Sequence, residues 1–205
     1  MKTSNGTWAN PPLEVSGEVT PARISAEVLA LYQHGRAADA GADFKPWAMQ
    51  RAAALVRFES TNWVSGVMTP RGPRTHEVRT ENMGESYWGA FSATLAEADP
   101  LGERMLANPG VSYLVGQADF PPRTAAVMQA WGIESGVLGM MADRSTGTFS
   151  VVVWHRGAGL PPFGEAERRL HEQLLPHWVE GLQLYRVGVR CATCISRPGP
   201  AGWPR

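Results

Sequence analysis

Residues 148–186 read TFSVVVWHRGAGLPPFGEAERRLHEQLLPHWVEGLQLYR and carry the strongest structural signals in the chain. The first seven residues are rich in β-branched and aromatic side chains, which predicts a strand over 148–154. A loop with several glycines and prolines follows over 157–162. From about residue 164 to residue 186, apolar residues recur every three or four positions, and this period predicts a long amphipathic helix.

The segments upstream of this stretch alternate between predicted strands and helices. A strand over 135–142 is joined to 148–154 by Asp143-Arg-Ser-Thr-Gly147, which has the composition of a hairpin turn. Buried strands are predicted over 62–69 and 111–115, and an edge strand over 74–80. Helical periods begin near residues 24, 46, 86, 100 and 121. This order predicts an α+β fold with a central, mostly antiparallel sheet flanked by helices and a long C-terminal helix.

Length and composition limit the classes of protein to which the chain can belong. Its 205 residues suit one domain, and 43% hydrophobic with 19% charged residues is typical of a globular chain. The formal net charge of zero argues against nucleic-acid binding by this chain alone. We find no apolar run long enough for a membrane span and no secretory signal, and therefore expect a cytoplasmic protein without membrane contact.

The pattern divides the chain into three parts. Residues 1–22 contain scattered prolines and no periodicity, which predicts a flexible N-terminal arm. Residues 23–186 form the predicted domain, and residues 187–205 follow as a tail without a recognisable pattern. Cys191 and Cys194 lie in this tail, and we interpret them as incidental cysteines, because no second Cys/His pair is near them in the sequence.

Several short motifs within 151–180 resemble a known family. The Arg156 that ends the strand, Pro162-Phe163, Glu167-Arg168-Arg169-Leu170 and Leu175-Pro176-His177 are similar to the end of the GAF-like sensor domain in bacterial LuxR-type transcription regulators. In that family a DNA-binding helix-turn-helix follows the terminal helix, whereas residues 197–205, RPGPAGWPR, look like GC-rich DNA translated in an unintended frame. The resemblance implies a small-molecule-sensing input domain that lacks its DNA-binding half, through a frameshift or through loss of the effector.

Residues with catalytic or metal-binding spacing are scarce. The chain contains no His-Glu-x-x-His, Gly-x-Ser-x-Gly or P-loop sequence, so we do not expect an enzyme or a bound cofactor. The five histidines are scattered, and we interpret them as surface or capping residues. We therefore predict no metal site.

The resemblance also indicates where a ligand would bind. In a GAF-like domain the pocket lies between one face of the sheet and the connecting helices and loops, and its occupant here would be a small, largely apolar molecule. The candidate ligand-binding residues are Trp63, Ser65, Trp88, Phe91, Tyr113, Trp131 and Met140. The alternative is that these side chains simply fill the core, which would make the chain a ligand-free dimerisation or interaction module.

The predicted terminal helix offers a second surface. Its apolar stripe can cover the sheet while its flank pairs with a second copy of the chain, and a homodimer is expected from the family resemblance. The candidate residues for this contact are Leu174, Trp178, Leu182 and Tyr185. A ligand signal would then leave the domain through this helix.

Overall fold

The computed structural model describes residues 19–37, 43–84, 86–95, 99 and 101–195. Its elements along the chain are α1 (Pro21–Arg36), α2 (Phe44–Ala53), β1 (Ser60–Thr69), β2 (Gly72–Glu81), α3 (Ser86–Leu95), α4 (Gly102–Ala107), β3 (Ser112–Gly116), the 3-10 helix η1 (Gln117–Asp119), α5 (Pro122–Ala130), β4 (Ser135–Asp143), β5 (Thr148–Arg156) and α6 (Glu165–Ile195).

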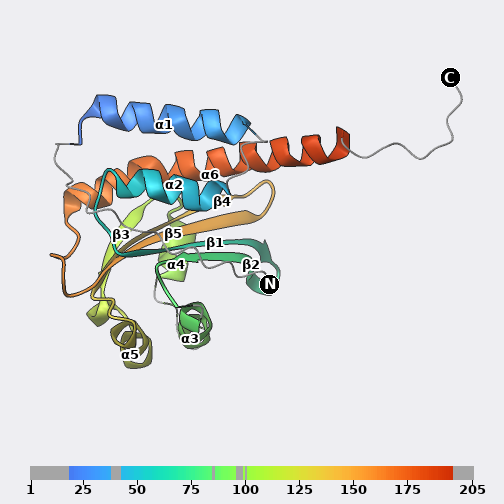
Figure 1. The fold of residues 1–205 in the computed structure, drawn as a ribbon. Helices are drawn as coiled ribbons and strands as arrows, with labels where there is room; N and C mark the ends of the chain where they lie inside the picture. The colour runs from blue at the N-terminus through green and yellow to red at the C-terminus, as the bar shows by residue number, and fades with distance from the viewer. Residues whose placement is uncertain (1–18, 38–42, 85, 96–98, 100, 196–205) are drawn as a thin grey trace, which may run out of the picture.

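The five strands form one sheet in the order β2-β1-β5-β4-β3, and every neighbouring pair is antiparallel. Helices α1, α2 and α6 lie on one face of this sheet, and α3, α4 and α5 lie on the other (Figure 1). The predicted α+β class is therefore confirmed, with β2 as the edge strand expected over 74–80.

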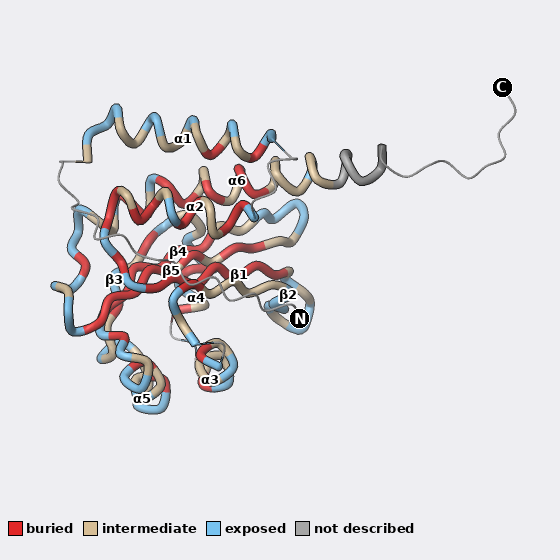
Figure 2. Tube along the Cα trace, in the orientation of Figure 1, coloured by how far each residue is buried: buried red, intermediate tan, exposed pale blue. Residues whose placement is uncertain are grey.

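The face of the sheet toward α1, α2 and α6, here called the packed face, carries most of the buried core (Figure 2). Trp63 of β1, Trp154 of β5 and Trp178 of α6 each expose 1% or less of their surface. The Trp154 ring stacks on Phe58 at a centroid distance of 5.1 Å and meets Trp178 edge-on at 5.5 Å. Such aromatic pairs add to the stabilisation from burial, so this layer fixes how α6 lies on the sheet.

Helix α1 packs on α6, and two glycines permit their close approach. A Cβ atom on Gly35 would lie 2.6 Å from the Gly181 carbonyl oxygen, and one on Gly181 would lie 2.6 Å from the Phe44 ring. Any side chain at either position would therefore force α1 or α2 away from α6.

Helix α6 is longer than the sequence pattern predicted. We expected it to end near residue 186 and the following residues to be unpatterned, but the helix continues to Ile195 (Figure 1). It also passes through Pro176 without interruption. The first proline after the expected end is Pro198, so residues 187–195 contain no helix breaker of that kind. The side chains of Cys191 and Cys194 lie outside the described part of the chain. No described helix is both long and apolar enough to cross a membrane.

The motif residues that carried the family resemblance join β5 to the start of α6. The Arg156 guanidinium donates to the carbonyl oxygens of Arg57 and Pro161 at 2.8 and 3.1 Å and pairs with the Glu167 carboxylate. It also lies 3.9 Å from the centre of the Phe163 ring. Because Arg156 is 5% exposed, these contacts compensate a buried charge and hold the β5–α6 connection in place.

Candidate functional site

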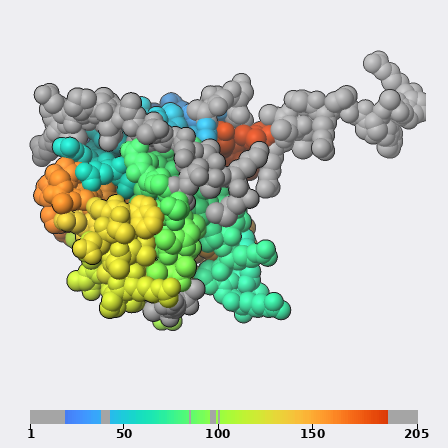
Figure 3. All heavy atoms as spheres, turned by 60° about the horizontal axis from the view of Figure 1, so that its bottom comes forward, coloured from blue at the N-terminus to red at the C-terminus, as the bar shows by residue number. Residues whose placement is uncertain are grey.

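A cavity of about 390 Å³ lies between the sheet and helices α3, α4 and α5. We call this side of the sheet the cavity face. Its floor is formed by strand residues that alternate with those of the packed face, namely Asn62, Val64, Leu138, Met140, Phe149, Val151, Val153 and His155. The opposite wall is formed by the helical residues Tyr87, Trp88, Phe91, Ser92, Leu95, Gly102, Met105, Leu106 and Met128. Figure 3 shows the molecule turned toward this side, with α5 in yellow.

Most of the cavity wall is apolar. Aromatic rings from α3 (Tyr87, Trp88 and Phe91) and from β5 (Phe149) are combined with the flexible thioethers of Met105, Met128 and Met140. Methionine adapts its shape and makes favourable contacts with aromatic rings, so this lining suits an apolar molecule. A volume near 390 Å³ falls within the range of small-molecule pockets.

Three buried polar side chains interrupt this apolar surface. Asn62, His155 and Tyr87 are 2%, 5% and 1% exposed. The Asn62 side chain is close enough to the Tyr87 hydroxyl to influence its pKa, and the Tyr87 ring meets the His155 ring edge-on at 6.0 Å. Asn62 Oδ1 and His155 Nδ1 have no hydrogen-bond partner among the described residues. Two buried atoms in the wall of one cavity therefore remain open for hydrogen bonds.

Burial keeps the side chains of His155 and Tyr87 uncharged. It lowers the pKa of His155 to about 3, because the imidazolium form would lose its hydration. Burial likewise raises the pKa of Tyr87 above its ordinary value, and the neighbouring Asn62 side chain offsets this only in part. Asp99 is the single charged residue among the described residues that line the cavity, and its exposed carboxylate accepts the backbone N–H of Gly102.

The structure brings three of the predicted ligand-binding residues into the cavity wall, namely Trp88, Phe91 and Met140. Two others lie beside it without lining it. Tyr113 packs under Arg104, whose guanidinium lies 4.8 Å from the ring centre, and Trp131 meets the ring of Tyr87 edge-on at 5.7 Å.

Trp63 and Ser65 do not line this cavity, because both belong to the packed face, where Ser65 borders a second hollow. Trp63 lies in the core next to Phe44, and the Ser65 hydroxyl lies 3.1 Å from Lys45 Nζ. Strand β1 has buried side chains on both faces, so its pattern does not show which face borders the cavity. The correct residues of β1 are the intervening Asn62 and Val64.

Sequence reasoning also missed His155, Tyr87 and Phe149. A usable signal was present for the first of these and for Asn62, because each is a polar residue directly next to a tryptophan in a largely buried strand. Such positions in a buried strand need a hydrogen-bond partner, which points to a packed polar network or to a ligand.

The charged groups of the packed face have partners. Lys45 is 1% exposed, and its ammonium lies 3.1 Å from Glu77 Oε1, while Arg186 of α6 binds the other Glu77 oxygen at 2.6 Å. Burial lowers the pKa of Lys45 to about 8, although the Glu77 carboxylate opposes this shift. Nearby, a more polar hollow of about 510 Å³ lies between α6 and the ends of β1, β4 and β5.

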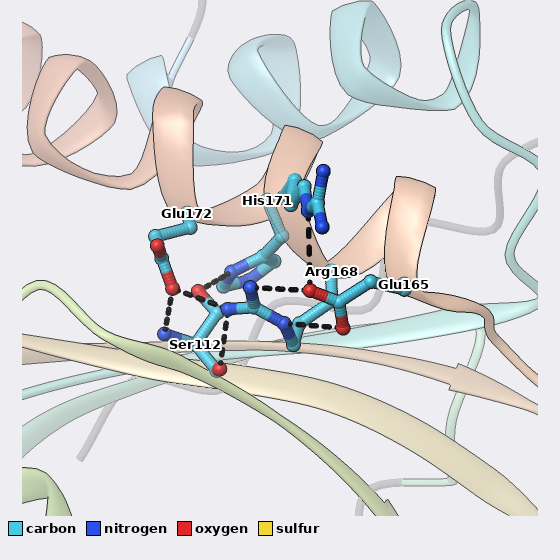
Figure 4. A network of polar contacts seen from close by, with 6 residues as sticks. Ser112, Glu165, Arg168, His171 and Glu172 are labelled. Carbon is cyan, nitrogen blue, oxygen red and sulfur yellow. Dashed lines mark hydrogen bonds and ion pairs between the residues drawn. The ribbon is translucent and has the colours of Figure 1, made fainter.

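The interpretation of His155 and His171 as surface or capping residues was wrong. His171 is fully buried between α6 and β3, where its Nδ1 lies 2.7 Å from the Ser112 hydroxyl (Figure 4). The Ser112 backbone N–H donates to Glu172, and its carbonyl oxygen accepts from Arg168, which also pairs with Glu165. This network joins the edge strand β3 to α6.

The predicted dimer residues of α6 lie in the interior of the chain itself. Leu174, Trp178 and Leu182 are 1%, 1% and 3% exposed, and Tyr185 is half-buried against the same core. Helix α1 covers α6 from outside, so the apolar stripe faces the protein's own layers (Figure 1). Leu174, Trp178 and Leu182 are therefore not available to a second copy of the chain.

Within the described ranges, no group of three or more His, Cys, Asp or Glu side chains is placed to hold a metal ion. The cavity wall instead combines neutral polar atoms with apolar surface, which can bind an organic molecule by burial and hydrogen bonding.

Comparison with known proteins identifies the fold. No protein-family model and no curated protein matches the sequence. Among solved structures, the N-acylhomoserine lactone dependent LuxR-family transcription factor CepR2 of Burkholderia cenocepacia matches with a TM-score of 0.59 and 17% identity over 82% of this chain and 97% of that one. SdiA of Escherichia coli, in complex with octanoyl-rac-glycerol, matches with a TM-score of 0.60 and 16% identity over 92% and 75% of the two chains.

The phycoerythrobilin-bound GAF domain of a cyanobacterial phytochrome matches with a TM-score of 0.56 and 10% identity, covering 83% of this chain and 98% of that one. At these identities the similarity concerns the fold. The chain therefore has a GAF-like α+β fold of the kind found in LuxR-family regulators such as CepR2 and SdiA.

Proposed function

We propose that the chain is the small-molecule-sensing input domain of a LuxR-type transcription regulator and that its ligand occupies the cavity between the sheet and helices α3, α4 and α5. The observation that carries this proposal is the cavity of about 390 Å³, which aromatic and methionine side chains leave unfilled. A core that served only to stabilise the fold would be close-packed at this position. The same observation disfavours the alternative of a ligand-free interaction module.

Structural neighbours support this proposal. CepR2 depends on an N-acylhomoserine lactone, and SdiA has been solved with octanoyl-rac-glycerol, so two proteins of this fold use ligands with an apolar and a polar part. The signal would leave through α6, because this helix covers the sheet and continues to Ile195. Ligand affinity must differ between two conformations for such signalling to occur.

Homodimerisation is a further part of this proposal. Since Leu174, Trp178 and Leu182 are buried, other residues of α1 and α6 would form the contact. Leu29 of α1 and Val187 of α6 are large apolar side chains with 58% and 61% exposure. Light scattering at increasing concentration measures the oligomeric state, and a constant monomer mass would contradict a dimer.

Thermal unfolding of the full chain with octanoyl-rac-glycerol, octanamide and methyl octanoate tests the proposed site. A ligand at a hundredfold excess over its Kd should stabilise the protein by about 2.7 kcal/mol. Met140→Trp, which fills the cavity, should abolish the stabilisation, whereas Met141→Leu on the opposite face of β4 should preserve it. Absence of stabilisation by all three probes, or equal stabilisation of the filled variant, would contradict a ligand site here.

A further inference from the structure

We infer that the cavity selects an uncharged molecule with an apolar body and a hydrogen-bond-donating head group, and that Asn62 and His155 hold the head group. This inference rests on the proposed function and specifies the chemistry of its ligand.

The first argument is the position of the two residues. Asn62 pairs with Val153 in the β1–β5 ladder, and His155 is two residues farther along β5, so both side chains belong to the cavity face. Diagonal neighbours on one face of an antiparallel pair lie about 7–8 Å apart, within reach of long side chains. A single small head group can therefore contact both.

The second argument is that both residues carry a buried polar atom without a partner. Asn62 Oδ1 and His155 Nδ1 lack hydrogen bonds among the described residues, although their side chains are at least nine-tenths buried. The unpartnered atom of Asn62 is Oδ1, an amide oxygen that can only accept a hydrogen bond. An acceptor of this kind is satisfied by a donor, and neutral imidazole can accept or donate at Nδ1 according to its tautomer.

The third argument concerns charge. No described residue of the cavity wall carries a positive charge, and burial keeps His155 neutral at physiological pH. A carboxylate or phosphate would therefore be buried without a cation, next to the open oxygen of Asn62. Such a charge is costly to bury, so the cavity disfavours anionic ligands.

Three probes with the same acyl chain separate these properties. Octanamide is uncharged and has a donor, methyl octanoate is uncharged and lacks one, and octanoate is charged at pH 8. For the wild-type chain, isothermal titration calorimetry should give octanamide a Kd at least about tenfold lower than that of octanoate. A Kd for octanoate equal to or below that of octanamide would overturn the exclusion of charge.

The role of Asn62 is tested by the ratio of the methyl octanoate Kd to the octanamide Kd. Asn62→Leu should lower this ratio by about tenfold, because the variant no longer offers an acceptor to the amide. The matched control Met141→Leu, on the opposite face of β4, should leave the ratio unchanged. His155→Phe is the second variant, expected to change the ratio in the same direction and usable if Asn62→Leu does not fold.

These measurements distinguish a failure of ligand binding in the cavity from a failure of the head-group contacts assigned to Asn62 and His155. If neither these probes nor octanoyl-rac-glycerol bind the wild-type chain, the proposed function itself is contradicted. If methyl octanoate binds and the ratio is the same in the wild type, Asn62→Leu and His155→Phe, the ligand site stands and the assignment of the head group to these residues is overturned.

Discussion

The two faces of the sheet use the same strands but are packed in different ways. On the packed face, Trp63, Trp154 and Trp178 fill the space under α6, and the buried cations Lys45 and Arg156 are paired with carboxylates. On the cavity face, smaller and more flexible side chains leave about 390 Å³ unfilled. This difference indicates that the first face mainly stabilises the fold, whereas the second contains the space in which the proposed ligand would bind.

The largest expected effect is the loss of a tryptophan from the packed face. Trp154→Ala should lower the free energy of unfolding by about 3–5 kcal/mol, because it leaves a cavity among close-packed rings. Phe91→Ala on the cavity side should cost less than about 2 kcal/mol, since its half-buried ring already borders an open space. Urea unfolding measures both, and equal losses would remove the distinction between the two faces.

Breaking a charge pair on the packed face should have the next largest effect. Arg156→Met removes the partner of Glu167 and the donor to two backbone carbonyls, with an expected cost of about 3 kcal/mol. Arg169, 69% exposed in its side chain, provides the control, because Arg169→Met should change stability by less than about 0.5 kcal/mol. An equally small effect of Arg156→Met would show that this junction does not stabilise the fold.

Acidification should destabilise both faces through one buried histidine each. Burial lowers the pKa of His155 and of His171 to about 3, so the unfolded chain binds protons near the ordinary pKa of 6.5 while the folded chain does not. The free energy of unfolding should therefore fall as the pH drops below 6.5, by up to about 2 kcal/mol per histidine at pH 5.

Variants distinguish the contribution of these histidines to the pH dependence of unfolding from that of the acidic residues, which also titrate at low pH. His155→Phe should flatten the pH dependence of unfolding between pH 6.5 and 5, and the exposed His76→Gln should leave it as in the wild type. A profile of His155→Phe that parallels the wild type would mean that folding does not lower the pKa of His155.

The smallest effect on stability is expected from a polar residue of the cavity face. Asn62→Leu should change the free energy of unfolding of the ligand-free chain by less than about 1 kcal/mol, because it replaces a buried amide whose oxygen has no partner by an apolar side chain of similar size. Chemical unfolding without ligand checks this value. A loss above about 3 kcal/mol would assign Asn62 to the structural core.

The sequence predicted the fold well because the signals that specify it are local. The strand, turn and helix over 148–186 follow from β-branched residues, hairpin chemistry and helical period, and the structure has each of them. The sequence pattern predicted the end of α6 too early, near residue 186. The loss of apolar periodicity there indicated an end, and the absence of a helix breaker is a weaker signal that the helix continues.

The candidate site was predicted only in part. Trp88, Phe91 and Met140 line the cavity, whereas Trp63 and Ser65 lie on the packed face, and Asn62 and His155 were missed. Successive side chains of a strand point to opposite faces of the sheet. Choosing every second residue of β1 from the wrong starting position therefore places all its candidates on the other face together.

The sequence by itself determined the order of the elements, the antiparallel sheet and the amphipathic terminal helix, because propensity and periodicity act over a few neighbouring residues. Only the tertiary structure decided which face of β1 borders the cavity and that Leu174, Trp178 and Leu182 lie inside the chain. Those outcomes depend on how α1, α2 and α6 fill one face with large rings, and the fit of side-chain volumes between distant segments is not encoded in any local pattern.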